Sequence, residues 1–228
     1  MKTDFMYYIL DLSADTAIIG SQYPQVQKMK AGYDYNALNA ADKLSRYYQA
    51  LPEFTPNMDS FVLHGHAKPT DFLSSALTGP WGHIVSEKVK HILEGFKLPP
   101  VHAFYPIQMK YRKGELHGYY WLHMICDLTD IVDYRGSTFY VKNFRSDLGG
   151  IKVSSREDLL LKREHLKEDL GDIGITICAK KIKLVHPVEY DFFSVGFFDS
   201  NDYITPSLKE TLEQEGATGI TIKVSSVL

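Results

Sequence analysis

Residues 78–94 read TGPWGHIVSEKVKHILE, a glycine-rich turn that leads into an amphipathic helix. Ser86 is a favourable N-cap, and Glu87 places a negative charge at the positive end of the helix dipole. The apolar residues that follow at three- and four-residue spacing are Val89, Ile92, Leu93 and Phe96. The stretch contains a well-defined helix start and no catalytic motif, which favours a binding protein over an enzyme.

A similar pattern returns near the C-terminus. Residues 203–213 (YITPSLKETLE) align with residues 84–94 (IVSEKVKHILE), so that Thr205 matches the capping hydroxyl of Ser86. The lysines, the apolar pairs and the final glutamates of the two segments also coincide. Two interpretations stay open: any capped amphipathic helix has this pattern, or two similar strand–helix units stand in equivalent roles and frame one groove.

The remaining chain alternates short β-prone segments with a few helical ones. The predicted helices are residues 36–51, 86–96 and the helix after Thr205, and residues 156–170 form a solvated helix face or an exposed loop. The predicted strands are residues 5–12, 61–63, 102–111, 119–126, 131–134, 138–144, 173–185, 192–198 and 221–227. This order predicts an α+β fold with a mainly antiparallel sheet and a few helices, arranged as two packed lobes. We place the N-terminal α+β lobe at residues 1–76 and the C-terminal lobe at residues 77–228.

Composition narrows the function classes. The chain has 228 residues, a net charge of -3 and no basic stripe, which disfavours nucleic-acid binding through phosphate contacts. No apolar run reaches the roughly 18 residues of a membrane span, and the N-terminal residues lack the features of a signal peptide. Cys126 and Cys178 lie in apolar runs and are expected to be buried reduced thiols. We expect a cytoplasmic protein that does not act on membranes.

Several segments in a fixed order resemble immunity family eleven of bacterial polymorphic toxin systems, formerly a domain of unknown function. The segments are GPWG (79–82), IVSEKV (84–89), HAFYPI (102–107), YYWLH (119–123), DIVDY (130–134), FFDS (197–200) and TGI (218–220). The resemblance covers residues 30–222. It implies that the chain binds and neutralises a toxin encoded by an adjacent gene. The family offers no catalytic residues to transfer, and its matching residues here, such as Gly82, Ser86 and Pro106, are expected to shape the backbone, while Trp81 and Tyr105 pack.

The sequence offers little for catalysis. His64 and His66 follow a predicted strand, and alternate residues of a strand face the same side, so the pair could supply two metal ligands. No further ligand pairs with them in the sequence, and a surface loop with two solvated imidazoles is the expected arrangement. The G-x-S-x-G and G-x-G-x-x-G motifs are absent from the sequence. We therefore predict no catalytic residues, no cofactor and no metal.

Residues 191–203 combine carboxylates with aromatic side chains. Many toxins delivered between bacteria act on nucleic acid and have basic clefts, which an acidic and aromatic surface would complement. We name Asp199, Asp202 and Tyr203 as candidate interface residues; a core strand followed by a polar turn explains the same pattern. Two other functions stay open: a metal-dependent hydrolase that uses His64 and His66, and a scaffold protein of a secretion apparatus.

Overall fold

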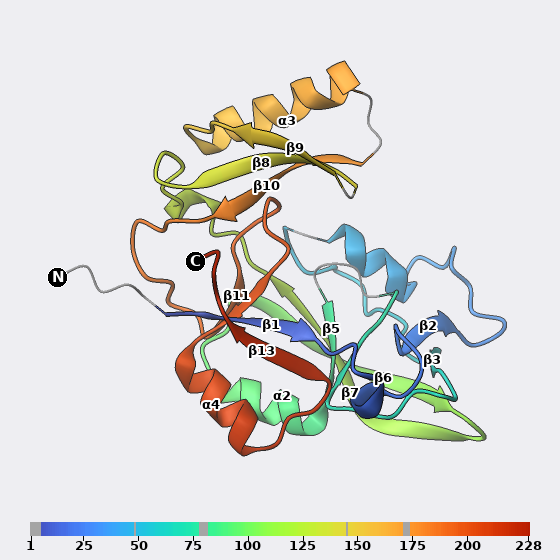
Figure 1. Ribbon diagram of the computed structural model, residues 1–228. Helices are drawn as coiled ribbons and strands as arrows, with labels where there is room; N and C mark the ends of the chain where they lie inside the picture. The colour runs from blue at the N-terminus through green and yellow to red at the C-terminus, as the bar shows by residue number, and fades with distance from the viewer. Residues whose placement is uncertain (1–5, 48, 78–81, 145, 171–173) are drawn as a thin grey trace.

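The computed structural model describes residues 6–47, 49–77, 82–144, 146–170 and 174–228. Within these residues the strands form three sheets (Figure 1). Neighbouring strands run antiparallel except β3 and β6, which run parallel. The prediction of an α+β fold with a mainly antiparallel sheet and a few helices is confirmed.

The strands have the following order within each sheet. The first sheet contains β2 (Val26–Met29), β3 (Phe61–Leu63), β6 (Val101–Tyr111), β7 (Gly114–Ile125), β5 (Gly82–Ser86) and β4 (Phe72–Leu73). The second contains β11 (Phe192–Ser194), β12 (Asp202–Ile204), β1 (Tyr8–Leu12) and β13 (Ile220–Val224). The third contains β10 (Ile175–Lys181), β8 (Thr138–Asn143) and β9 (Ser146–Ile151). The helices are α1 (Thr16–Ile19), α2 (Glu87–Glu94), α3 (Arg156–Leu170) and α4 (Pro206–Gln214), with 3₁₀ helices at Ala41–Arg46 and Thr129–Ile131.

Helix α2 begins where its sequence predicts. The Val89 N–H donates to Ser86 Oγ at 3.3 Å, so Ser86 is the N-cap, and Val89 and Leu93 are buried. The helix follows β5 directly, and β5 begins at Gly82 beside the ring of Trp121, where an added Cβ would collide with the indole. The predicted turn at Gly79, Pro80 and Trp81 lies outside the described residues.

The alignment between the two helix starts corresponds to a real structural repeat. Thr205 caps α4 as Ser86 caps α2, and the buried leucines and valine of both helices share one hydrophobic cluster. Before each strand–helix unit lies another related segment, TDFLS at residues 70–74 and YDFFS at residues 190–194. These segments form the edge strands β4 and β11, which pair with β5 and β12.

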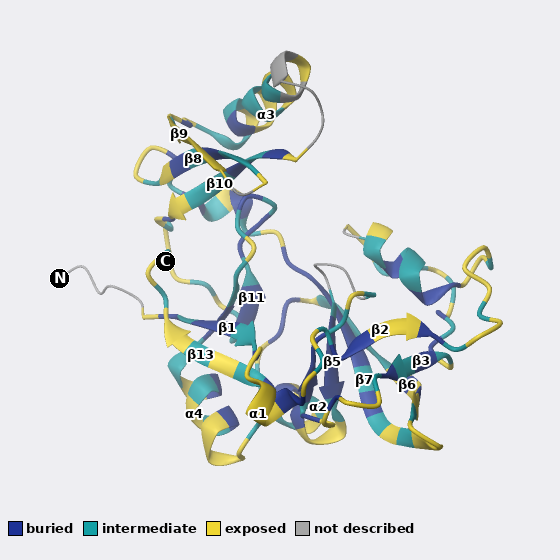
Figure 2. Ribbon diagram, turned by 45° about the vertical axis from the view of Figure 1, so that its right-hand side comes forward, coloured by how far each residue is buried: buried dark blue, intermediate teal, exposed yellow. Residues whose placement is uncertain are grey.

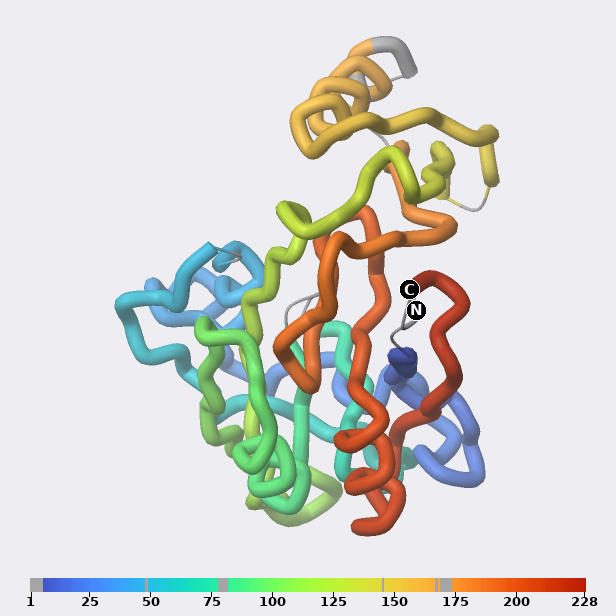
Figure 3. Tube along the Cα trace, turned by 90° about the vertical axis from the view of Figure 1, so that its left-hand side faces the viewer, coloured from blue at the N-terminus to red at the C-terminus, as the bar shows by residue number. Residues whose placement is uncertain are grey.

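The strand order extends the repeat to two four-stranded units. The order β4-β5-β7-β6 in one sheet corresponds to β11-β12-β1-β13 in the other, with every neighbouring pair antiparallel. The hairpin β6–β7 is continuous, whereas its counterparts β13 and β1 come from opposite ends of the described chain. The Ser225 N–H donates to the Tyr7 carbonyl at 2.9 Å, and these two end segments lie side by side (Figure 3). Of the two open interpretations, the structure therefore favours two equivalent strand–helix units.

Strands from residues 6–76 share sheets with strands from residues 82–228. Strand β4 pairs with β5, β3 pairs with β6, and β1 lies between β12 and β13. A boundary between residues 76 and 77 would therefore divide the first and the second sheet, because the described strands before it pair with strands after it.

Two predicted elements form only in small part. The helix over residues 36–51 is reduced to the short 3₁₀ helix, and Leu38, whose spacing from Ala41 and Leu44 would place it on the inner face of such a helix, is 88% exposed. The Asn36 N–H donates to Asp34 Oδ1 at 2.8 Å, a local side-chain bond that competes with helix formation. The strand over residues 131–134 is reduced to a single antiparallel bridge between Val132 and Leu184, which follows the 3₁₀ helix.

The third sheet and α3 form a projecting unit, which we call the α3 unit (residues 138–170 and 174–181). Helix α3 covers one face of this sheet, and Phe139 and Ile177 pack with Leu159 of the helix. The other face turns toward the second sheet, and Figure 2 shows how the unit stands apart from the two larger sheets. Phe198 joins the unit to the second sheet, since its ring lies 5.6 Å from that of Phe139.

Candidate functional site

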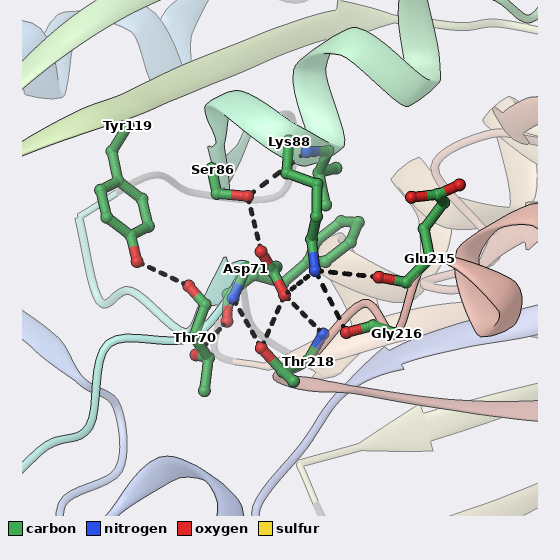
Figure 4. Close-up of polar contacts among 10 residues, drawn as sticks. Thr70, Asp71, Ser86, Lys88, Tyr119, Glu215, Gly216 and Thr218 are labelled. Atoms are coloured by element: carbon green, nitrogen blue, oxygen red, sulfur yellow. Dashed lines mark hydrogen bonds and ion pairs between the residues drawn. The ribbon is translucent and has the colours of Figure 1, made fainter.

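A polar cluster centred on Asp71 joins the start of α2 to the segment after α4 (Figure 4). Asp71 Oδ1 accepts a hydrogen bond from Ser86 Oγ at 2.8 Å. Asp71 Oδ2 accepts from the Thr218 N–H at 2.9 Å and from Thr218 Oγ1 at 2.8 Å, and it lies 2.9 Å from Lys88 Nζ. Lys88 also donates to the carbonyls of Glu215 and Gly216. Burial disfavours the charged form of Asp71, but the hydrogen bonds from its neighbours outweigh burial and hold its pKa below the ordinary aspartate value.

This cluster is structural. Ser86 Oγ, the hydroxyl that could act as a nucleophile, already donates to Asp71 and caps α2. The second unit repeats the arrangement: Thr205 Oγ1 donates to Asp191 Oδ1 at 2.7 Å, and the Lys97 N–H donates to Asp191 Oδ2 at 2.9 Å. Each aspartate thus binds the N-cap of one helix and the backbone after the end of the other. We call Asp71 and Asp191 the two aspartate clasps.

His64 and His66 are not arranged like a pair of metal ligands. His64 and His66 have ring centroids 5.4 Å apart, and the His66 N–H donates to His64 Nδ1 at 3.3 Å. Within the described part of the chain, no group of three or more histidine, cysteine, aspartate or glutamate side chains is arranged to hold a metal ion. The neighbouring surface is basic, with Lys28, Lys110 and Arg112 around a shallow hollow of about 700 Å³.

A cleft of about 1150 Å³ lies between the α3 unit and the rest of the molecule. Its floor is formed where the two repeated units meet, at the starts of β5 and β12. The residues that line this floor are Ser75, Gly82, His83, Ser194, Asp199 and Asp202. The α3 unit supplies the opposite wall. We call this hollow the central cleft.

A histidine–aspartate contact joins the two units at the floor of the central cleft. His83 of β5 and Asp202 of β12 occupy matching positions in the repeat, and His83 Nε2 lies 3.3 Å from Asp202 Oδ2. His83 is only 9% exposed, and its ring lies 5.2 Å from the ring of Phe192. Its Nδ1 atom is buried and has no hydrogen-bond partner in the described structure.

The three candidate interface residues, Asp199, Asp202 and Tyr203, lie close together, but they differ in exposure and role. Asp199 and Asp202 line the central cleft and are half-buried. Tyr203 is fully buried, and its hydroxyl donates to Asp199 Oδ2 at 2.6 Å. Tyr203 therefore positions Asp199 and presents no surface to a partner, because the sheet alternation turns its side chain into the core.

Asp199 accepts several hydrogen bonds but has no cationic partner within the described part of the chain. Asn201 donates to Asp199 Oδ1 through its N–H at 3.2 Å and through Nδ2 at 2.6 Å. No described lysine, arginine or histidine forms an ion pair with Asp199. Burial raises the pKa of Asp199 above the ordinary value, although the bonds from Tyr203 and Asn201 oppose the shift. The fold thus keeps this carboxylate in a position that disfavours its charge.

The wall of the cleft comes from residues that the sequence reasoning missed. Tyr140 and Lys142 of β8, with Thr176 and Cys178 of β10, line the cleft and alternate with buried residues that face α3. The alternation in ITIC at residues 175–178 is the signal that could have identified this face. His83 was also missed, although the aligned repeat places it opposite Asp202.

We expect Asp199→Asn to raise the midpoint of thermal unfolding at pH 7. Folding raises the pKa of Asp199, so the protonated side chain is tolerated in the folded state better than the charged one. The protein is therefore most stable with respect to this group below the unfolded pKa, and it loses that stability as pH rises through the folded pKa. Asparagine removes the buried charge, and a gain of about 1 kcal/mol corresponds to about 2 to 4 °C in a chain of this size. Calorimetry at pH 7 and pH 4 checks this: the gain should shrink at pH 4, and a lower midpoint at pH 7 would contradict it.

None of the described helices is long and apolar enough to cross a membrane. In comparisons with known proteins, the family model of the Immunity protein family (Imm11) matches residues 11–178. This match covers β2 to β9, α1 to α3 and the first residues of β10, while Asp199 and Asp202 lie beyond it. No curated protein matches the chain. Since the match spans most of the chain, the protein belongs to the Imm11 immunity protein family.

Proposed function

We propose that this chain is an immunity protein that binds a toxin of a bacterial polymorphic toxin system and neutralises it by forming a stable complex. The observation that carries the proposal is the family match over residues 11–178. The toxin is the product of an adjacent gene, and the complex forms in the cytoplasm of the cell that must be protected.

The structure supports neutralisation by binding in two ways. The polar side chains of the Asp71 cluster bind one another and hold the start of α2 against the segment after α4. The central cleft has a volume of about 1150 Å³, which is larger than most small-molecule sites and can accept a polypeptide segment. A protein that works by binding needs such a shaped surface on a rigid scaffold.

Co-expression of the chain with the product of the adjacent gene tests the proposal. We expect the chain to restore survival of cells that make the toxin, and we expect the two proteins to purify together in a stoichiometric complex. Rescue without a complex would contradict neutralisation by binding and would indicate enzymatic reversal of the damage. Failure to rescue cells from a proven toxic neighbour would contradict the immunity function itself.

A further inference from the structure

We propose that the central cleft is the toxin-binding surface, and that it receives a toxin segment whose lysine or arginine side chain pairs with Asp199 and Asp202. This inference rests on the proposed function and adds the location of the interface and the chemistry of the toxin segment.

The charge of the cleft is the first argument. Asp11, Asp199 and Asp202 line the cleft, while Lys142 is the lysine in the described lining. Asp11 is already paired with Lys223, whose Nζ lies 2.6 Å from Asp11 Oδ2. Asp199 has no cationic partner among the described residues, and a cationic side chain from a partner protein would complement it.

The burial of the floor is the second argument. His83 is 9% exposed and lines the cleft, and its buried Nδ1 atom has no hydrogen-bond partner among the described residues. Asp199 is held in place by the buried Tyr203 hydroxyl and by Asn201, so its carboxylate is fixed before any partner arrives. Polar groups that are desolvated and pre-positioned in this way cost folding energy, and they are typical of binding sites.

The shape of the cleft is the third argument. The floor lies at the junction of the two repeated units, and the wall is the face of the third sheet opposite α3. Phe144, which is 64% exposed, and Tyr140 lie on this wall and can supply aromatic contacts around the charged centre. A central charged contact enclosed by aromatic side chains is typical of binding hot spots.

The basic hollow beside His64 is the competing surface. Lys28, Lys110 and Arg112 would suit an acidic partner segment. Lys28 and Lys110 are exposed, so water already solvates their charges, whereas the charge of Asp199 is partly desolvated. The structure therefore favours the central cleft.

Titration calorimetry with the purified product of the adjacent gene tests the inference. We expect Asp199→Asn to raise the dissociation constant by at least about 30-fold and Asp202→Asn by about 10-fold, since removal of one partner of a desolvated charge pair is costly. The exposed Asp59→Asn is the matched control and should change it less than about 2-fold, as should Lys110→Glu at the basic hollow. Unfolding midpoints confirm that each variant is folded.

The outcomes separate the two proposals. If the wild-type chain binds the toxin and Asp199→Asn binds equally well, the cleft assignment is overturned while the proposed function stands. If Lys110→Glu alone weakens binding, the basic hollow replaces the cleft. If the wild-type chain does not bind a proven toxin, both proposals fail.

Cys178 provides a second readout that needs no substitution. It lines the cleft and is half-buried, whereas Cys126 is only 4% exposed and serves as the internal control. Burial raises the pKa of both thiols, so labelling with a maleimide is best followed at mildly alkaline pH. We expect bound toxin to slow labelling of Cys178 at least about 10-fold, through exclusion of the reagent. Equal labelling rates with and without saturating toxin would overturn the assignment.

Discussion

Gly219→Ala is expected to lower the free energy of unfolding by about 3 to 5 kcal/mol, because a left-handed backbone and a steric collision act together. Gly219 has φ +86° and is buried between α4 and β13. A Cβ at this position would collide with the Phe72 carbonyl oxygen, which is backbone and cannot turn aside. Urea unfolding measured by circular dichroism gives the loss directly.

Gly216→Ala is the matched control for this prediction. Gly216 has φ +60° and follows the same helix, but an added Cβ would meet nothing within 4 Å. Its substitution should cost only the penalty of the left-handed conformation, about 1 kcal/mol. Equal losses for the two variants would show that the approach of Gly219 to β4 is not as tight as the structure indicates.

Asp71→Ala is expected to cost about 2 to 4 kcal/mol of stability, because it breaks a half-buried charged cluster and leaves Lys88 without its carboxylate. The variant loses the contacts to Ser86 and Thr218 as well, so the start of α2 separates from the segment after α4. Glu94→Gln is the control: Glu94 pairs with Lys90 on the surface of α2, and its loss should cost less than about 0.5 kcal/mol.

The pH dependence of stability shows whether charge or packing causes the loss in the Asp71 variants. The folded state lowers the pKa of Asp71, so its contribution is present above the unfolded pKa of about 4 and is lost as pH falls through the folded pKa. The stability difference between wild type and Asp71→Asn should therefore shrink below about pH 4. A difference that stays constant down to pH 2 would show that packing, and not charge, is responsible.

The sequence predicts those helices and strands whose formation is decided by residues close together in the chain. Ser86 and Thr205 marked both helix starts because N-capping involves only the first turn, and the hairpin of β6 and β7 followed from strand alternation around a short polar turn. The predicted helix around Leu38 does not form, also for a local reason. The apolar residues there have helical spacing, but the Asp34 side chain binds the neighbouring backbone N–H of Asn36 instead.

The candidate site could be predicted only in part, because it is assembled from distant segments. Asp199 and Asp202 were identified from composition, but the burial of Tyr203 depends on how β12 pairs with β1 and β11. The contact between His83 and Asp202 joins strands of two different sheets, so it cannot be predicted from the residues near either one in the sequence. The aligned helix starts held this information, since two equivalent units that pack together bring equivalent residues to their junction.

Titration of purified toxin activity with the purified chain tests whether the chain neutralises its toxin by forming a complex with it. Neutralisation by binding predicts that residual toxin activity falls linearly and reaches its minimum at one equivalent of chain, when the concentrations of both proteins are well above the dissociation constant. Full protection at a small fraction of one equivalent would contradict it, because only a catalyst can act on many toxin molecules. Undiminished toxin activity at excess chain would also contradict it.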